Sequence, residues 1–359
     1  MKVLKKIMRI LPGAVGVLLA AAIGLFVYLQ VTEFSPDEIG TVEVTPAEEA
    51  GAQEEAGEDR QTLTVLTWNT GFGCLGDNAD FFMDGGKGVK TATKERMEQN
   101  VNGMIETIRA EEPDVIFLQE TDRDSTRSSH EDQTQMYRDA FTDCSSAFAN
   151  NFKVAFLPYP IPPIGKVDSG LLTLTSLEIS EAERISLPCP FSWPVRLVNL
   201  KRCLLMTRVP LENGSELVLI NLHLEAYDDG EGKAAQTAQL RSILEEEAEA
   251  GNYVIAGGDF NQTFSDVDLT DYPVAEGMWA PGLIDTDDFS DDWQLLMDGS
   301  LPSCRSLDQP YEGAGHDQFQ YYIIDGFIVS GNLKVTRFET LDAGFTCTDH
   351  NPVILEVEL

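Results

Sequence analysis

Side chains suited to metal and acid–base chemistry recur at the ends of predicted strands. Each lies directly after, within or directly before a run of apolar residues, and all are Asp, Glu, Asn or His. The set comprises Asn69, Glu120, His223, Asp259, Asn261, Asp325, Asp349 and His350. Because core strands bring their ends together and loops there build functional sites, we expect these side chains to share one site.

The chemistry of this set favours hydrolysis of a phosphoester. Oxygen ligands from Glu, Asp and Asn suit Mg²⁺, with Mn²⁺ or Ca²⁺ as alternatives, and such a cation acts as Lewis acid and template. Phosphoester cleavage needs charge neutralised on the phosphoryl group and a positioned nucleophile. Asp325 lies between Ile324 and Phe327, where an unpaired carboxylate is costly, so we expect His350 to be its partner.

Taken singly, these residues also have ordinary structural interpretations. Asp259 and Asn261 follow two glycines and fit a turn, and residues 349–352 fit a turn before a strand. His223 alone is more often a structural histidine. If the strand continues through Asp259 and Asn261, their side chains point to the same face. The combination of residues, not any single one, therefore indicates a catalytic site.

Apolar runs alternate with helical periodicity along residues 62–359. Helices are predicted over residues 94–113, ending at Pro113, and 233–251, ending at Gly251. Strands are predicted over residues 63–69, 114–120, 170–179, 202–211, 216–223, 253–261, 320–330 and 351–359. This alternation in a chain of 359 residues predicts an α/β domain.

Residues 1–31 have the composition of a membrane-spanning signal anchor. Four basic residues, Lys2, Lys5, Lys6 and Arg9, precede an uncharged run from Ile10 to Val31. The run suits a bilayer core of roughly 20 helical residues and is longer than the about 7–15 of a cleaved signal peptide. Basic residues before the span predict a cytoplasmic N-terminus. We therefore expect a single-pass protein of the cell membrane, with its catalytic domain extracytoplasmic.

Residues 32–61 are rich in Glu and Asp and predict an acidic flexible linker before a domain over residues 62–359. The formal net charge is −35. This charge disfavours a broad nucleic-acid surface, because Lys and Arg bind backbone phosphates. It does not exclude nucleic acid at a site that carries its own metal ions. The six cysteines show no CxxC spacing, so no structural zinc site is expected.

The segments around the polar residues resemble those of the endonuclease/exonuclease/phosphatase (DNase I-like) superfamily. The matching segments, in the family's order, are LTWN (66–69), PDVIFLQE (113–120), NLHLEA (221–226), GGDFNQ (257–262), IDGFIV (324–329) and TDHNPV (348–353). Residues 123–141 and 223–240 are similar to membrane-anchored bacterial members. The resemblance implies a four-layer α/β sandwich of two packed, mostly antiparallel sheets, here preceded by one transmembrane helix.

The resemblance also implies a role for each residue of the set. Glu120 is the expected main metal ligand, supported by Asn69 and Asp349. Asp259 and Asn261 are expected to orient the attacking water and hold the phosphate. His350, held by Asp325, and His223 are expected at the phosphoryl oxygens. Some branches of the family have a tyrosine at the position of His223. This chain follows the branches that have His there, which disfavours an abasic-site repair role.

These observations predict a divalent-metal-dependent phosphodiesterase acting on a lipid headgroup or small phosphoester. The alternative is an anchored nuclease that uses the same residues. A non-catalytic binding module is a third interpretation, disfavoured because the full set of acids and histidines is present. The loops at 71–93, 121–133, 150–169 and 263–320 carry no motif that identifies the substrate.

Overall fold

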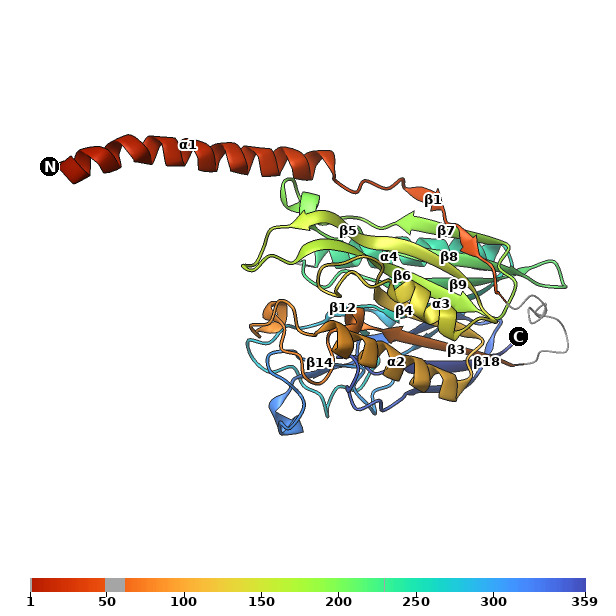
Figure 1. Cartoon of the computed structure of the whole chain (residues 1–359). Helices are drawn as coiled ribbons and strands as arrows, with labels where there is room; N and C mark the ends of the chain where they lie inside the picture. The colour runs from red at the N-terminus through yellow and green to blue at the C-terminus, as the bar shows by residue number, and fades with distance from the viewer. Residues whose placement is uncertain (1, 49–61, 229) are drawn as a thin grey trace.

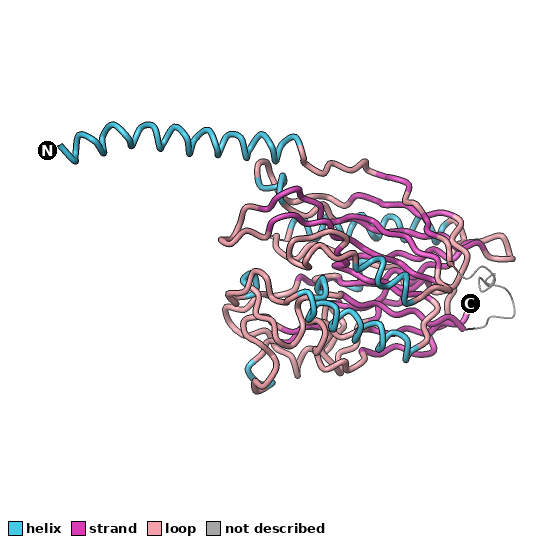
Figure 2. The backbone as a smooth tube through the Cα atoms, viewed as in Figure 1, coloured by secondary structure: helices cyan, strands magenta, loops and turns pink. Residues whose placement is uncertain are grey.

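Two seven-stranded β-sheets pack face to face in the part of the chain that the computed structural model describes, residues 2–48, 62–228 and 230–359. Helices α2 (Lys94–Glu111) and α3 (Gln133–Ala140) cover the outer face of one sheet, and α4 (Glu231–Glu249) covers the other (Figures 1 and 2). The predicted four-layer α/β sandwich is therefore confirmed.

The strand order differs from the sequence order in both sheets. The first sheet runs β17 (Lys334–Thr340), β18 (Val353–Glu358), β3 (Thr62–Asn69), β4 (Val115–Asp122), β6 (Gly165–Thr175), β5 (Ser145–Leu157), β2 (Val44–Thr45). The second runs β1 (Ile39–Thr41), β7 (Glu181–Ser186), β8 (Cys203–Pro210), β9 (Glu216–His223), β10 (Tyr253–Asp259), β16 (Asp325–Ser330), β13 (Trp293–Leu296). Two small sheets pair β11 (Gln262–Phe264) with β12 (Gly282–Ile284), and β14 (Cys304–Arg305) with β15 (Tyr321–Tyr322).

Alternation of side chains along the strands explains the layers. On β9, Leu217 and Leu219 belong to the apolar cluster between the sheets, while Val218, Ile220 and Leu222 pack with the helix α4. Burying both faces requires the nearly continuous apolar runs from which these strands were predicted. The interior becomes polar toward one end, where Gln119 Nε2 of β4 donates a 2.8 Å hydrogen bond to Asn221 Oδ1 of β9.

Each sheet contains one parallel pair among its described strands, and each pair is joined by a helix. β3 and β4 are connected through α2, and β9 and β10 through α4. Parallel strands end at the same edge of a sheet, so Asn69 pairs in register with Gln119, and His223 with Asp259. The antiparallel strand β16 begins beside the end of β10, with Asp325 opposite Asp259. The two helix-linked units thus place the polar strand ends together.

The N-terminal helix α1 (Lys2–Val31) projects from the sandwich (Figure 1). Its segment Leu11–Val31 is long and apolar enough to cross a membrane. After it, β1 pairs with β7 of one sheet and β2 with β5 of the other. The first part of the predicted linker 32–61 therefore packs on the domain, and residues 49–61 lie outside the described residues.

Gly258 is required where β10 passes β9. A Cβ atom there would lie 1.9 Å from the carbonyl oxygen of Leu222, and φ is +150°. We expect Gly258→Ala to lower the free energy of unfolding by about 3 kcal/mol or more. Gly214→Ala is the matched control, because Gly214 has φ +85° and no atom within 4 Å, and it should cost about 1 kcal/mol. Equal losses of unfolding free energy for the two variants, measured by urea denaturation, would contradict the requirement for glycine at position 258.

Candidate active site

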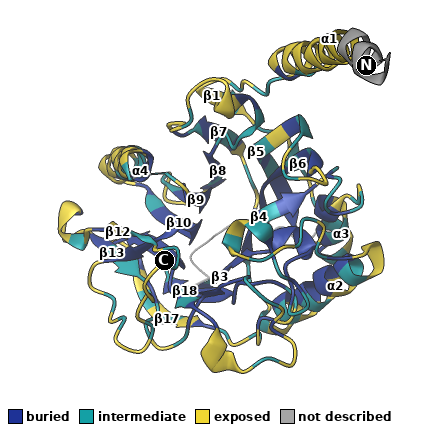
Figure 3. Ribbon diagram, turned by 90° about the vertical axis from the view of Figure 1, so that its left-hand side faces the viewer, coloured by how far each residue is buried: buried dark blue, intermediate teal, exposed yellow. Residues whose placement is uncertain are grey.

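The predicted site residues meet at the end of the sandwich where β3 ends, at the left in Figure 1 and facing the viewer in Figure 3. Asn69 is the link between the sheets. Its Nδ2 donates to Asp259 Oδ2 at 3.0 Å and to Glu120 Oε1 at 3.5 Å. Its Oδ1 accepts a 3.0 Å hydrogen bond from the Gly71 backbone N–H, which fixes the amide orientation. The Asn69 amide therefore contacts both Glu120, the expected metal ligand, and Asp259, which is expected to orient the attacking water.

Carboxylates gather on the Glu120 side of this amide. Glu120 follows Gln119 with a left-handed φ of 54°, a strained backbone that redirects its side chain at an irregularity of the β4–β6 pairing. Burial raises the pKa of Glu120; Arg127 opposes this shift and Asp349 adds to it. Asp349 is held by the Thr348 hydroxyl, which donates to its Oδ1 at 3.1 Å. The negative charge of Asp349 thus adds to the effect of burial on the Glu120 carboxyl group.

Asp84 is a further carboxylate here that sequence reasoning missed. It ends the 3-10 turn η2 (Phe82–Asp84) in the loop after β3. Burial, Asp349 and Glu120 raise the pKa of Asp84 to about 7. Tyr227, in the loop after β9, keeps 46% of its surface exposed. Burial and then the charges of Asp84 and Glu120 raise the pKa of its hydroxyl. No sequence motif surrounds either residue, so only the fold reveals them.

Asp259 and two histidines form the other side. Asp259 Oδ2 lies 3.3 Å from His223 Nε2 and 3.9 Å from His350 Nε2. Burial and then Asp325 raise the pKa of Asp259 to about 7. A carboxyl group with a pKa near neutrality suits proton abstraction from a water molecule.

The pKa values of the two histidines are shifted in opposite directions. Burial disfavours the charged ring of His350, but Asp325, whose Oδ2 lies 2.8 Å from Nδ1, and Cys304 raise the pKa of His350 well above its usual value. Burial, Arg202 and His350 lower the pKa of His223 well below its usual value. The expected pairing of Asp325 with His350 is present in the structure. A site with one charged and one neutral imidazole can both donate and accept a proton.

Asn261 lies beside the site, but it is not part of the strand that was predicted to include it. β10 ends at Asp259, and Asn261 has a left-handed φ of 50°, so the strand alternation does not extend to it. Its Nδ2 donates to the Leu224 carbonyl at 3.0 Å, and its backbone N–H donates to Asp259 Oδ1 at 2.9 Å. Asn261 therefore ties the ends of β9 and β10 together and orients the Asp259 carboxylate.

Arg202 is a buried cation that sequence reasoning also missed. Its Nε and Nη1 have no hydrogen-bond partner within the described residues, and Nε lies 3.9 Å from Glu225 Oε2. β8 is antiparallel to β9, so the residue before β8 lies beside the end of β9, near His223. A basic residue directly before the apolar run 203–206 was the available signal. Unpartnered guanidinium donors suit an anionic oxygen.

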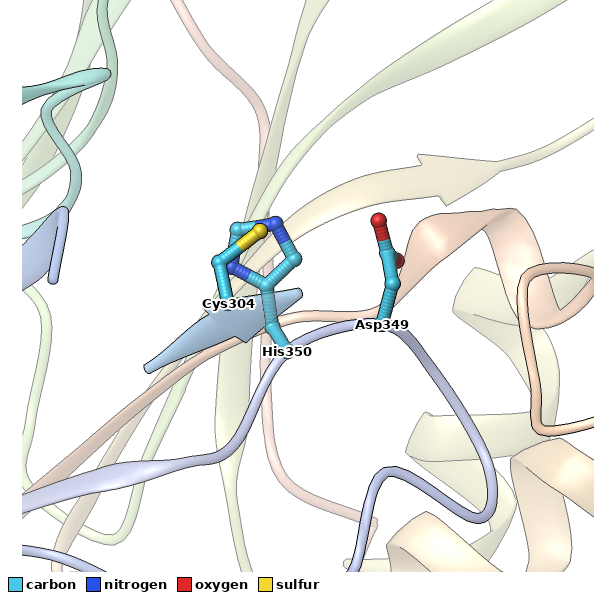
Figure 4. A group of neighbouring side chains, drawn as sticks. All are labelled: Cys304, Asp349 and His350. Carbon is cyan, nitrogen blue, oxygen red and sulfur yellow. The ribbon is translucent and has the colours of Figure 1, made fainter. Parts of the chain in front are cut away.

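Cys304 lies against His350 and Asp349. Figure 4 shows the thiol beside the imidazole and the Asp349 carboxylate on the same side of the chain. Ligand atoms of the three residues lie within 4.8 Å of one another, and an antiparallel bridge pairs Cys304 with His350. Burial raises the pKa of the Cys304 thiol to about 12, so the thiol is uncharged at neutral pH and leaves the charge of the site to its carboxylates.

The residues present fit a divalent cation. Burial raises the pKa values of Glu120 and Asp84, and the charge of Asp349 adds to both shifts. Hard oxygen donors of this kind prefer Mg²⁺, Mn²⁺ or Ca²⁺. Further buried polar atoms lack a hydrogen-bond partner in the described chain, among them His223 Nδ1, Asp325 Oδ1 and Glu225 Oε2. Buried carboxylate oxygens without a hydrogen-bond partner, beside the unsatisfied donors of Arg202, suit a metal ion together with an anionic ester.

This fold and site define a two-sheet phosphoester hydrolase. The sequence profile of the Endonuclease/Exonuclease/phosphatase family matches residues 66–350, and the chain belongs to this family. Members of the family hydrolyse phosphoester bonds and generally depend on divalent metals. Curated protein sequences contain no match to the chain.

Solved structures with the same fold have low sequence identity to the chain. An endonuclease/exonuclease/phosphatase from Beutenbergia cavernae has a TM-score of 0.54 at 18% identity, over 84% of this chain and 72% of that one. A family protein from Bacteroides thetaiotaomicron has a TM-score of 0.52 at 14% identity, over 83% and 95%. TDP2 from D. rerio, complexed with a single-strand DNA product, has a TM-score of 0.50 at 16% identity, over 83% and 99%. These similarities concern the fold.

Removing the charge of Asp325 tests the state of His350. We expect Asp325→Asn to lower kcat by about 100-fold, because the ring loses the carboxylate that stabilises its charged form. Asp298→Asn is the control, since Asp298 accepts hydrogen bonds from the backbone N–H groups of Ser300 and Thr340, neither of which is a site residue. Steady-state rates on a common phosphodiester, with circular dichroism to verify folding, provide the measurement. An unchanged kcat in a folded Asp325→Asn variant would refute the role.

Replacing Arg202 tests whether its unsatisfied donors bind an anionic oxygen of the substrate. We expect Arg202→Met to lower kcat/KM by about 10–100-fold, with Arg202→Lys intermediate because it keeps the charge but not the planar fork. The matched control is Arg208→Met, because Arg208 pairs with Glu216 and Glu247 farther along β8. Losses of the same size for Arg202→Met and Arg208→Met would attribute both to stability.

Proposed function

We propose that the protein is a membrane-anchored, extracytoplasmic, divalent-metal-dependent phosphodiesterase that hydrolyses a lipid headgroup or a small phosphoester. The observation that carries this proposal is the junction at Asn69, where the carboxylates beside Glu120 meet Asp259 and its two histidines. Acidic groups gathered in a buried place, a carboxyl group with a raised pKa, and an arginine with unsatisfied hydrogen-bond donors together match the needs of phosphoester cleavage.

Each residue of the site has a distinct role in the proposed reaction. Glu120 and Asp349 would hold the cation, with Asn69 fixing Glu120, and the bound cation would polarise the phosphoryl oxygens. Asp259 orients a water molecule and accepts its proton. Arg202 and the charged His350 bind phosphoryl oxygens, and His350 is the available proton donor for the leaving oxygen. Burial of these groups excludes bulk water and strengthens each interaction.

Membrane anchoring rests on the N-terminal helix. The segment Leu11–Val31 has the length and apolar composition of a membrane span, and its flanking basic residues precede it. This polarity favours an extracytoplasmic catalytic domain. A catalytic domain anchored in this way meets phospholipids at a high local concentration.

A nuclease is the second candidate function. It is favoured by the shared fold of TDP2 from D. rerio, which was solved with a single-strand DNA product. The net charge of −35 opposes it, because few cations remain to bind a polynucleotide backbone. A non-catalytic module is disfavoured because the acids and both histidines lie in contact, as catalysis requires.

Metal removal tests the proposed class. We expect the detergent-solubilised full chain to cleave phospholipid headgroup esters or small phosphodiesters with Mg²⁺ or Mn²⁺ present. EDTA should lower the rate by at least about 100-fold, and added metal should restore it. Plasmid DNA and inositol phosphates complete the panel. Rapid nicking of DNA without turnover of the lipid or small esters would establish the nuclease instead.

Asp259→Asn separates an enzyme from a binding module. The amide preserves the size and the contact with Asn69 but cannot accept a proton. We therefore expect kcat to fall by about 100-fold or more while Mg²⁺ affinity, followed by calorimetry, changes little. Glu120→Gln should show the opposite emphasis, with weakened metal binding. Undiminished hydrolysis by the Asp259→Asn variant would show that the site is assigned wrongly.

A further inference from the structure

Helix α1 leaves the sandwich at the end that carries the site. Figure 1 shows α1 projecting past the end at which β3 terminates, and in Figure 3 both α1 and this end point toward the viewer. A membrane crossed by α1 would therefore lie beyond the site and not behind it. The described chain between Val31 and β1 is short, from Thr32 to Glu38, which leaves the domain close to the end of the helix.

Side-chain contacts fix α1 against the domain. Phe26 packs edge to face on Trp193, with 5.3 Å between ring centroids. Trp193 Nε1 donates a 3.0 Å hydrogen bond to Gln30 Oε1. Just after the helix, Glu33 Oε1 lies 3.4 Å from Arg196 Nε and 3.3 Å from Lys201 Nζ. These contacts set the direction of the helix relative to the site.

Apolar side chains stand exposed on two segments at the end of the sandwich from which α1 projects (Figure 1). The loop between β5 and β6 presents Tyr159 and Ile161, and Ile161 is 93% exposed. The segment that includes the 3-10 turn η3 (Val195–Val198) presents Trp193 and Val195, both more than half exposed. We call these four residues the apolar rim. Exposed aromatic and aliphatic side chains beside an apolar helix are typical of the membrane interface.

The apolar rim is connected to the site by packing. Tyr159 contacts Phe82 edge to face at 6.2 Å, and Phe82 begins the turn η2 that ends with Asp84 of the site. Phe82 and Val198 pack against one apolar cluster, made of Val154, Ile164 and Val167. The rim, the site and α1 are thus connected by side-chain packing at one end of the molecule.

We propose that this end of the sandwich faces the bilayer in which α1 is inserted, with the apolar rim entering the headgroup region. The site then opens on phosphodiesters of the same membrane leaflet. The inference rests on the proposed function for the nature of the substrate, but the orientation is independent of catalysis. It makes a lipid in the anchoring membrane the substrate class of the site.

A lipid surface suits the rim better than a second copy of the chain. The exposed apolar surface of the rim continues onto the exposed side chains of α1, including Phe26 and Val27, and a bilayer covers such a helix. A net charge of −35 on each chain opposes close approach of two copies.

Quenching by brominated lipids tests the orientation without any assay of activity. The full chain is placed in nanodiscs of phosphatidylcholine with brominated acyl chains. We expect Ile161→Trp to add emission that these lipids quench, relative to nanodiscs of the unbrominated lipid. The matched control is Ile39→Trp, because Ile39 is 58% exposed on β1, away from the rim (Figure 1). Equal quenching of the two added signals, or none at Ile161→Trp, would overturn the proposal.

A comparison of two substrates tests the consequence for catalysis. In nanodiscs, Ile161→Asp should lower hydrolysis of a bilayer phospholipid at least about tenfold and leave hydrolysis of its water-soluble headgroup diester within about twofold. Ile39→Asp should affect neither. Equal losses on both substrates, or dimerisation at the rim detected by light scattering, would refute the membrane-facing site. Quenching at Ile161→Trp without hydrolysis of either substrate would uphold the orientation and reject the proposed function.

Discussion

The hydrogen bond from Asn69 to Asp259 joins the two sheets at the point where the site is built. It spans 3.0 Å between the last residue of β3 and the last residue of β10. It is possible because each sheet contains a parallel pair whose strands end at the same edge. Below it, the Gln119–Asn221 hydrogen bond crosses the same interface and keeps the sheets in register. Glu120, His223 and His350 lie around this junction.

Gathering these ionisable groups in a buried place shifts their pKa values. Asp84 and Asp259 have pKa values near 7 because neighbouring carboxylates and burial disfavour their charge. His350 gains a stable charge from Asp325, and that charge in turn helps keep His223 neutral. Such opposed shifts within one cluster are costly for stability and useful for chemistry. A bound cation would stabilise the buried carboxylates, and a phosphodiester would stabilise the basic side chains beside them.

The sequence predicted the strands that are buried on both faces, and it did not predict strands that lack two buried faces. β3, β9 and α2 have continuous apolar or strongly periodic patterns, and their predicted bounds agree with the structure to within about two residues. β17, at a sheet edge, and β7, next to the short edge strand β1, alternate between charged and apolar residues and gave no clear signal. In the site, motif residues were found because they end strands, whereas Asp84, Arg202 and Tyr227 enter it from loops and a strand start that only tertiary packing brings together.

The central claim is that two sheets build one metal-assisted site at the Asn69 junction. The most direct measurement is the anomalous scattering of Mn²⁺ in crystals of the protein, collected at two wavelengths that distinguish the ion from water. The account predicts a Mn²⁺ peak bound by Glu120 and Asp349, which disappears in crystals of the Glu120→Gln variant. Mn²⁺ peaks confined to surface acids, with none beside Glu120 at saturating metal, would contradict it.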